Sequence, residues 1–275
     1  MPSPESSEPP LHTLLTGLVF PEQPRWHEGR LWFSDWGTQD VIAVDLDGKS
    51  EVILKGPSFP MCVDWLPDGR LLVVSGREGL LLRREPNGEL VTHADLRSID
   101  PLFNELVVDA RGNAYVNGAS LAVVTLDGAV RQEAGDLAFG NGMAITEDGG
   151  TLIVAESHGH RLTAFDIETD GGLSGRRVWA DLGDAAPDGI CLDADGACWY
   201  ADVPHRRCVR VREGGEVLEA IDADRGCFSC MLGGDDGRTL YVGAAEWFGM
   251  DRIAETAGTG RILSARVTVP HAGRP

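Results

Sequence analysis

One unit recurs six times along this chain of 275 residues, at intervals of about forty residues. Each copy begins with an apolar segment, turns at an Asp-Gly or similar pair, and continues into a second apolar segment. The copies read PEQPRWHEGRLWFSDW, PMCVDWLPDGRLLVVSG, FNELVVDARGNAYVNG, GNGMAITEDGGTLIVAES, PDGICLDADGACWYADV and CFSCMLGGDDGRTLYVGAA. A period near forty with several short strands per unit is typical of propeller blades. We therefore predict an all-β fold, a six-bladed β-propeller.

Strand signals inside each unit support this fold. Residues 71–74 and 151–154 are apolar runs bounded by glycine turns, as strands are. No amphipathic helix of about ten residues separates the units, which disfavours alternating strands and helices. A pair of β-sandwiches would not explain the sixfold period. We expect a single propeller over residues 11–270, a disordered tail over 1–10 and a second tail over 271–275.

A propeller must close its ring, and the sixth unit lacks an outer strand. Residues 11–20 form a spare strand-like segment near the N-terminus, and residues 260–269 form another near the C-terminus. We predict that both segments join the sixth blade, which would lock the two ends of the chain together.

The charge balance excludes some classes of partner. The chain has 24 Lys and Arg against 43 Asp and Glu, a formal net charge of −19. Proteins that bind nucleic acid gain affinity from clustered basic residues, which are absent here. The first ten residues lack the basic start and apolar stretch of a secretory signal, and no apolar run is long enough to span a bilayer. The expected partner is a small-molecule substrate, without nucleic acid or membrane, in a cytoplasmic protein of undetermined oligomeric state.

The six cysteines do not form a recognisable framework. They are too few for a disulfide scaffold at this length and do not make two CxxC pairs. Cys227 and Cys230 form one CxxC pair, a weak redox or metal signal. We interpret the cysteines as buried reduced thiols within strands.

The first positions of the six units contain candidate metal ligands. Innermost strands of a propeller run along the central axis, so equivalent positions converge at one channel mouth. Those positions hold Glu22, Met61, Asn104, Asn141, Asp188 and approximately Ser229. Four of them carry carboxylate or amide oxygens, the ligands that hard divalent cations prefer. The alternative interpretation is that Asn141-Gly142 and Asp188-Gly189 are only turn dipeptides. The matched phase of all four positions favours a metal site.

Several motifs resemble one family in combination. They are Phe20-Pro-Glu-x-Pro-Arg-Trp26, Asn104 before Val-Val-Asp109, Phe139-Gly-Asn-Gly-Met-Ala-Ile145, Pro187-Asp-Gly-Ile-Cys-Leu-Asp193 and Met231-Leu-Gly-Gly. Together they look like the senescence-marker-protein/gluconolactonase/luciferin-regenerating-enzyme (regucalcin-like) family. The resemblance implies a six-bladed propeller that hydrolyses lactones or related esters with one divalent cation, Ca²⁺ first and Zn²⁺, Mn²⁺ or Mg²⁺ as alternatives.

The resemblance also assigns site residues. Glu22, Asn141 and Asp188 match the three protein ligands of the cation, and Asn104 matches a ligand on the substrate side. A carboxylate beside the attacking water can act as general base, and Asp188 is the better placed of the two acids. We therefore expect Asp188 to serve as catalytic residue and ligand.

Some positions depart from the family pattern. Gln23 replaces a usual glycine, Leu102 replaces an arginine found in some members, and Glu105 replaces an aspartate. With Phe103 and Met61, these residues are expected to contact the substrate and to make the entrance wider and more apolar. A sugar lactone then becomes a less certain substrate.

Aromatic and histidine side chains give weaker signals. Trp36, Trp247 and Phe248 follow inner strand pairs and are assigned equally to the pocket wall or to core packing. His158, His160 and His205 are interpreted as solvated loop residues, although one of them could assist as a base.

Two further functions remain open at this stage. The altered pocket could perform Lewis-acid chemistry on a different, more apolar substrate in a biosynthetic role. Alternatively, the propeller could be a non-catalytic binding platform whose ion is structural.

Overall fold

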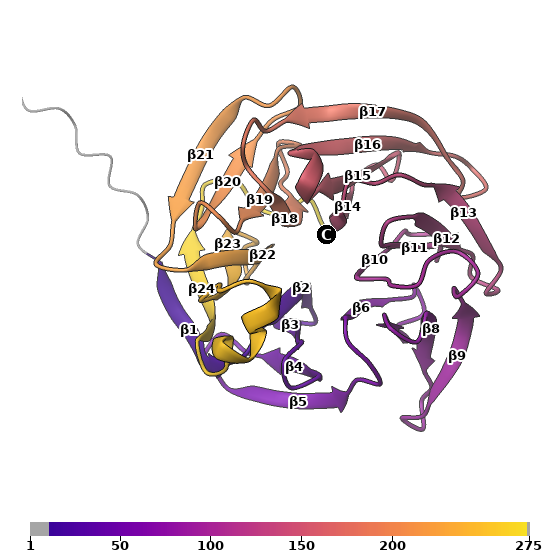
Figure 1. Cartoon of the computed structure of the whole chain (residues 1–275), viewed down its shortest axis with the longest axis horizontal. Coiled ribbons are helices and arrows are strands. Elements are labelled where there is room, and N and C mark those ends of the chain that lie inside the picture. Colours follow the sequence, from indigo (N-terminus) through magenta and orange to yellow (C-terminus); the bar gives the residue numbers. More distant parts are fainter. Residues whose placement is uncertain (1–10, 274–275) are drawn as a thin grey trace, which may run out of the picture.

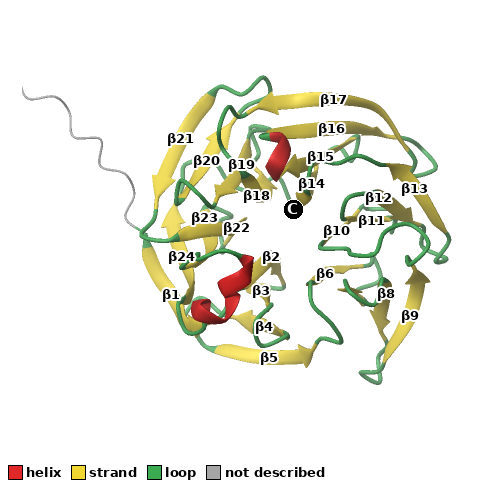
Figure 2. Ribbon diagram, viewed as in Figure 1, coloured by secondary structure: helices red, strands yellow, loops and turns green. Residues whose placement is uncertain are grey.

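The computed structural model describes residues 11–273 and arranges 24 strands in six four-stranded antiparallel sheets. The sheets form blades around a central axis (Figure 1). The helices in this part of the chain are two short 3-10 turns, η1 (Ser157–Gly159) and η2 (Met250–Thr256), drawn red in Figure 2. The predicted all-β six-bladed propeller is confirmed. Neither helix is long and apolar enough to cross a bilayer.

The first three blades follow the chain from the inner strand outward. Blade 1 contains β2 (Pro21–His27), β3 (Arg30–Asp35), β4 (Asp40–Val44) and β5 (Ser50–Lys55). Blade 2 contains β6 (Met61–Trp65), β7 (Leu71–Ser75), β8 (Leu80–Arg84) and β9 (Leu90–Asp95). Blade 3 contains β10 (Glu105–Val108), β11 (Ala114–Asn117), β12 (Leu121–Val124) and β13 (Val130–Ala134).

The last three blades continue the ring, and the sixth uses both ends of the described chain. Blade 4 contains β14 (Gly140–Ile145), β15 (Thr151–Glu156), β16 (Arg161–Ile167) and β17 (Leu173–Asp181). Blade 5 contains β18 (Pro187–Leu192), β19 (Cys198–Asp202), β20 (Arg207–Val211) and β21 (Val217–Asp222). Blade 6 contains β22 (Gly226–Gly233), β23 (Thr239–Ala245), β24 (Gly260–Arg266) and β1 (His12–Leu18).

The ring closes as the sequence predicts. Strand β1 pairs antiparallel with β24, from His12 opposite Ser264 to Leu18 opposite Gly260. In Figure 1 these strands are the indigo and yellow arrows that lie side by side. The N-terminal strand is therefore the outermost of blade 6. The predicted tail over residues 1–10 lies outside the described residues.

The described C-terminal residues are attached to blade 5. His271 forms an isolated bridge with Asp193, and the Ala272 amide donates to the Leu192 carbonyl at 3.1 Å. Ala272 is buried. Residues 271–273 of the predicted C-terminal tail thus pack on the propeller, and residues 274–275 lie outside the described part.

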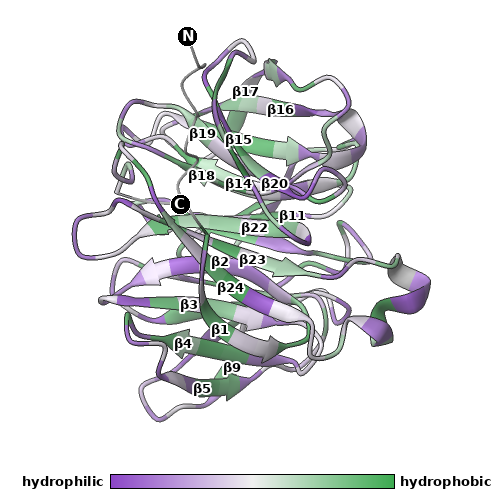
Figure 3. Ribbon diagram, turned by 90° about the vertical axis from the view of Figure 1, so that its left-hand side faces the viewer, coloured by the Kyte–Doolittle hydropathy of each residue, from purple (hydrophilic) through white to green (hydrophobic). Residues whose placement is uncertain are grey.

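The core lies between neighbouring blades. Strand β7 is buried along its whole length, whereas the outer strand β5 is mostly exposed. Figure 3 shows the corresponding pattern, with apolar strands joined by mostly polar turns. All six cysteines are free and buried, so the interpretation of Cys227 and Cys230 as buried thiols is confirmed.

Candidate active site

A cavity of about 380 Å³ lies at the channel mouth where the inner strands begin. It is lined by Phe20, Glu22, Trp36, Asn104, Phe139, Asn141, Ser157, His158, Ala186, Asp188, Val203, Pro204, Phe228 and Trp247. The four oxygen-bearing side chains that the repeat predicts to converge, Glu22, Asn104, Asn141 and Asp188, all line it. They come from blades 1, 3, 4 and 5 and are far apart in sequence.

Bulges in the inner strands coincide with these positions. The pairing register shifts between Glu22 and Arg25 in β2, between Gly140 and Met143 in β14, and between Pro187 and Ile190 in β18. A bulge inserts an extra residue and re-aims the neighbouring side chains. Strands β6 and β10 pair without a shift. The three blades assigned cation ligands are therefore blades whose inner strand is locally irregular.

Glycines after two of the predicted cation ligands, Asn141 and Asp188, allow the inner strands to approach each other. A Cβ atom on Gly142 would lie 2.5 Å from the Asp188 carbonyl oxygen, and one on Gly189 would lie 2.7 Å from the Ser229 Cα atom. Both glycines belong to strands, β14 and β18, and neither has a positive φ. The alternative interpretation of these pairs as turn dipeptides is therefore wrong, because the glycines serve close packing.

Replacing Gly142 with alanine is expected to destabilise the protein by about 1–3 kcal/mol, because backbone atoms of β18 cannot move aside for the methyl group. Urea unfolding measures the loss. Gly135→Ala is the matched control, since its Cβ would meet only the Gln132 side-chain nitrogen at 3.6 Å. Equal stability of the two variants would contradict the packing argument.

Hydrogen bonds orient the Asn141 side-chain amide at the cavity. Asn141 Nδ2 donates to Ser157 Oγ at 3.3 Å, and this hydroxyl donates to the Pro187 carbonyl at 2.6 Å, next to Asp188. Asn117 Nδ2 donates to the Asn141 carbonyl at 2.7 Å. Because its nitrogen is engaged, Asn141 can present its Oδ1 to a ligand. Asn104 Oδ1 is buried without a hydrogen-bond partner, an arrangement that favours a bound ligand.

The negative charge of the carboxyl groups at and below this mouth is only partly compensated. Burial raises the pKa of Glu22 well above its usual value, and the charges of Asp188 and then Glu105 raise it further. Burial, followed by the Glu105 charge, raises the pKa of Asp188, while a hydrogen bond from Asn141 lowers it. Burial also raises the pKa of Glu105 to about 7, against the lowering effect of Arg25. Such shifts are characteristic of functional sites.

A divalent cation fits this arrangement. The buried carboxylates of Glu22 and Glu105 and the half-buried carboxylate of Asp188 lie around one buried guanidinium, that of Arg25, so the ionised cluster carries two net negative charges. The donors are carboxylate and amide oxygens, which hard cations prefer. No three His, Cys, Asp or Glu side chains form a metal-binding group in the part of the chain described here. The candidate centre differs from such groups because amides supply two of its four donors.

Acidic residues at the ends of second strands hold the cavity rim. The Asp35 carboxylate, at the end of β3, accepts from the Phe20 amide at 2.9 Å. Glu156, at the end of β15, accepts from the Ala138 amide at 2.8 Å, next to Phe139. Asp202, at the end of β19, accepts from the Ala186 amide at 3.2 Å. These acids occur in blades 1, 4 and 5, and their shared phase in the repeat is a sequence signal for them.

The hydrogen bonds of Glu156 predict that the stability of the fold depends on pH in the acid range. Its hydrogen bonds with Arg161, Thr163 and the Ala138 amide outweigh burial and lower its pKa from 4.5 to about 2. A lowered pKa stabilises the fold above about pH 4.5, and the contribution is lost as pH falls towards 2. Glu156→Gln is expected to reduce the free energy of unfolding at pH 6, with the deficit shrinking between pH 4.5 and 3. Urea titrations of both proteins at several pH values measure it, and a constant deficit would contradict the assignment.

Several residues predicted to contact substrate lie outside the cavity. Met61 is buried beneath Trp36, whose Nε1 donates to the Met61 carbonyl at 2.6 Å. Phe103 is fully buried in the core between blades 2 and 3. Leu102 is 41% exposed on the loop before β10. Leu102 and Phe103 lie on the segment before β10, from which Asn104 but neither of these side chains reaches the cavity.

Two polar departures from the family pattern also lie below the mouth. Gln23 donates from Nε2 to the Leu106 carbonyl at 3.0 Å and accepts from the Val63 amide at 2.8 Å. Glu105 pairs with Arg25 at 3.0 Å, with both side chains buried. These groups connect blades 1, 2 and 3 across the channel. They support the candidate centre from beneath and do not line the cavity.

An aromatic wall supplies the apolar character that the sequence attributed to other residues. In blade 6 the pairing register shifts between Cys227 and Ser229. Phe228, between them, lines the cavity, while the Ser229 hydroxyl donates to the Pro21 carbonyl at 3.4 Å. Trp36 and Trp247 also line the cavity, but Phe248 does not. The sequence reasoning missed Phe20, Phe139 and Phe228.

The three histidines take different positions. His158 lines the cavity and stacks on Phe139, with ring centroids 4.6 Å apart, so it is not merely a solvated loop residue. His160 Nδ1 lies 2.7 Å from the Ala185 carbonyl, and His205 Nδ1 lies 2.9 Å from Asp202 Oδ2. His160 and His205 have structural partners and do not line the cavity.

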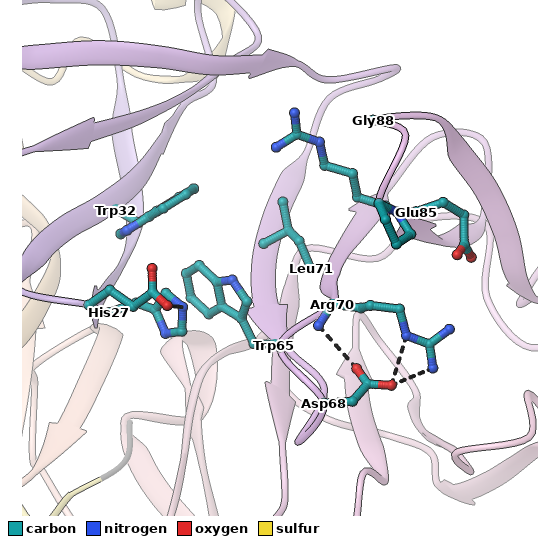
Figure 4. Close-up of a pocket in the computed structure, with 12 residues that line it drawn as sticks. His27, Trp32, Trp65, Asp68, Arg70, Leu71, Glu85 and Gly88 are labelled. Atoms are coloured by element: carbon teal, nitrogen blue, oxygen red, sulfur yellow. Dashed lines mark hydrogen bonds and ion pairs between the residues drawn. The ribbon is translucent and has the colours of Figure 1, made fainter.

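A second cavity, of about 500 Å³, lies where β2 and β6 end, at the opposite end of the inner strands. Figure 4 shows His27 against Trp65, with Trp32 nearby and Asp68 paired with Arg70. The His27 and Trp65 rings stack at 3.8 Å. None of the residues that the sequence predicts for the active site lines it.

Comparison with known proteins agrees with the architecture and the motifs. Residues 20–246 match the SMP-30/Gluconolactonase/LRE-like region. The chain belongs to this family. This SMP-30/gluconolactonase family member is 27% identical over 187 residues to a 6-deoxy-6-sulfogluconolactonase of Pseudomonas putida, an alignment that covers 63% of this chain and 64% of the relative.

Other relatives of this family member align over more of its length. A regucalcin of Xenopus laevis is 30% identical over 248 residues, covering 82% of both chains. The crystal structure of a calcium-binding regucalcin from Agrobacterium tumefaciens superimposes with a TM-score of 0.82 at 21% identity, covering 97% of both chains. That structural likeness supports the fold.

Proposed function

We propose that this SMP-30/gluconolactonase family member is a hydrolase of lactones or related esters that depends on a divalent cation, with Ca²⁺ as the first candidate. The observation that carries the proposal is the convergence of Glu22, Asn104, Asn141 and Asp188 on one cavity. Membership of the family and a relative named as a lactonase support the reaction class. A relative described as calcium-binding supports the cation.

Different residues of the chain have different proposed roles in the reaction. Glu22, Asn141 and Asp188 would hold the cation, and Asn104 would present its unpartnered oxygen on the substrate side. When bound, the cation supplies Lewis acidity for the lactone carbonyl and the attacking water. Asp188 accepts a proton from that water as the carbon–oxygen bond forms. It then returns the proton to the ring oxygen as the acyl carbon–oxygen bond breaks.

Chelation and reconstitution test the proposal. Protein treated with EDTA and dialysed is assayed on γ- and δ-lactones, alone and with Ca²⁺, Mn²⁺, Zn²⁺ or Mg²⁺. We expect hydrolysis to disappear on chelation and to return with at least one cation. No metal-restorable turnover on any lactone would overturn the proposal. Loss of stability on chelation without any activity would instead favour a structural ion.

A further inference from the structure

The wall of the cavity is aromatic, whereas its floor, defined here as Glu22, Asn104, Asn141 and Asp188, is polar. We infer, on the basis of the proposed function, that the substrate is a lactone or ester bearing an alkyl or aryl substituent, and that the aromatic wall selects it over a polyhydroxylated sugar lactone. The wall is defined here as Phe20, Trp36, Phe228 and Trp247.

The aromatic wall is a continuous surface. Phe20 lies at its centre, with ring centroids 4.4 Å from Phe228, 5.8 Å from Trp36 and 5.9 Å from Trp247. Phe228 and Trp247 contact each other edge to face at 5.4 Å. These rings come from blades 1 and 6, beside Glu22. A substrate whose carbonyl lies at the polar floor therefore projects any substituent onto aromatic rings.

The rest of the cavity lining is also largely apolar. Phe139 stacks on His158, Val203 packs against the cluster of Phe20 and Phe228, and Ala186 and Pro204 add further apolar lining. Phe139 has a positive φ of 61° and remains 52% exposed, which places a large apolar ring in a strained backbone at the mouth. Backbone strain of this kind clusters at ligand-binding positions. Both parts of the lining thus offer ring faces to a bound molecule.

Few groups are available for the hydroxyls of a sugar. Among the described residues that line the cavity, none is a lysine or an arginine. The Ser157 hydroxyl already donates to the Pro187 carbonyl and accepts from Asn141. Beyond the proposed ligands, the polar lining groups without a hydrogen bond in the described part of the chain are the His158 ring and the Trp247 indole nitrogen. Hydroxyls placed against the aromatic wall would lose their water partners without replacement, which disfavours sugar lactones.

The volume suits such a substrate. A cavity of about 380 Å³ falls in the range of about 300–1,000 Å³ that holds drug-sized ligands. It can therefore accept a lactone ring together with a substituent of several carbons. Each buried methylene is expected to raise kcat/KM about fourfold.

A graded substrate panel tests the inference. The metal-reconstituted protein is assayed on γ-butyrolactone, on homologues with alkyl side chains of increasing length, on dihydrocoumarin and on glucono-1,5-lactone. We expect kcat/KM to rise with chain length and to exceed the value for glucono-1,5-lactone at least tenfold. A preference for the sugar lactone, or no dependence on chain length, would overturn the inference while leaving the proposed function intact. Failure to hydrolyse any lactone would overturn both.

A pair of neighbouring variants assigns the preference to the wall. Trp247→Ala is expected to lower about tenfold the ratio of kcat/KM between a long-chain lactone and γ-butyrolactone, mainly through KM. Phe248→Ala is the matched control, because Phe248 is similarly exposed, at 41% against 37%, but does not line the cavity. An unchanged ratio in Trp247→Ala, or an equal change in the control, would contradict the role of the wall.

Discussion

Asp188→Asn is expected to reduce the kcat for lactone hydrolysis by about a hundredfold to ten-thousandfold, even at saturating cation. The substitution keeps an oxygen donor and nearly the same volume, but removes the charge and the proton acceptor. Asp188 is half-buried at the cavity, and the Asn141 amide already donates to its carboxylate. Cation affinity is measured by calorimetry and kcat by a pH-indicator assay on the same samples.

Two other variants separate the role of base from the role of ligand. Asn141→Ala should weaken cation binding, yet regain most of its kcat when the cation is saturating, because Asp188 remains. Asp184→Asn is the control, since its side chain is 90% exposed on the loop before β18 and the variant should behave as the unmodified protein. A kcat for Asp188→Asn within tenfold of the unmodified protein would exclude Asp188 as general base.

Arg25→Met is expected to destabilise the metal-free protein by about 3–5 kcal/mol, because it leaves the buried Glu105 carboxylate without its counter-charge. Arg25 Nη2 also donates to the Leu106 carbonyl at 2.6 Å, a bond that methionine cannot replace. The measurement is the free energy of unfolding in urea with EDTA present. When Ca²⁺ replaces EDTA, the deficit in the free energy of unfolding should shrink, since the cation supplies positive charge to the same cluster.

The double variant Arg25→Met/Glu105→Gln distinguishes charge from packing. It should recover most of the lost stability, because the remaining side chain is neutral. Arg30→Met serves as a surface control. Arg30 pairs with Glu51 at 3.1 Å, and the two side chains are 35% and 67% exposed, so its loss should cost less than about 1 kcal/mol. A deficit in Arg25→Met as small as in the control would contradict the buried pair.

Repetition made the oxygen-bearing positions predictable. Glu22, Asn141 and Asp188 occupy the same phase of the repeat, and sixfold geometry brings equal phases to one axis. The prediction of these positions needed no knowledge of side-chain contacts. It failed for Met61 and for the approximate Ser229 position, because it assumed that every inner strand pairs in the same way. The bulge in blade 6 places Phe228 at the cavity instead.

The apolar character of the entrance was anticipated, but its source was not. Leu102, Phe103 and Met61 are near Asn104 or in phase with it along the sequence, yet none of them lines the cavity. The aromatic wall comes from the residue before β2, from β22 itself, and from the segments after β3 and β23, in blades 1 and 6. Their proximity depends on ring closure by β1 and β24, which brings the last blade beside the first.

By itself, the sequence determined the six blades, the closure by both chain ends and the convergence of four oxygen-bearing side chains, because all three follow from periodicity. Only the tertiary structure decided which neighbouring side chains turn towards the axis. It also showed that Arg25 pairs with Glu105 below the site and that aromatic rings form one wall. These features depend on local bulges and on contacts between blades, and a pattern along one strand does not specify either.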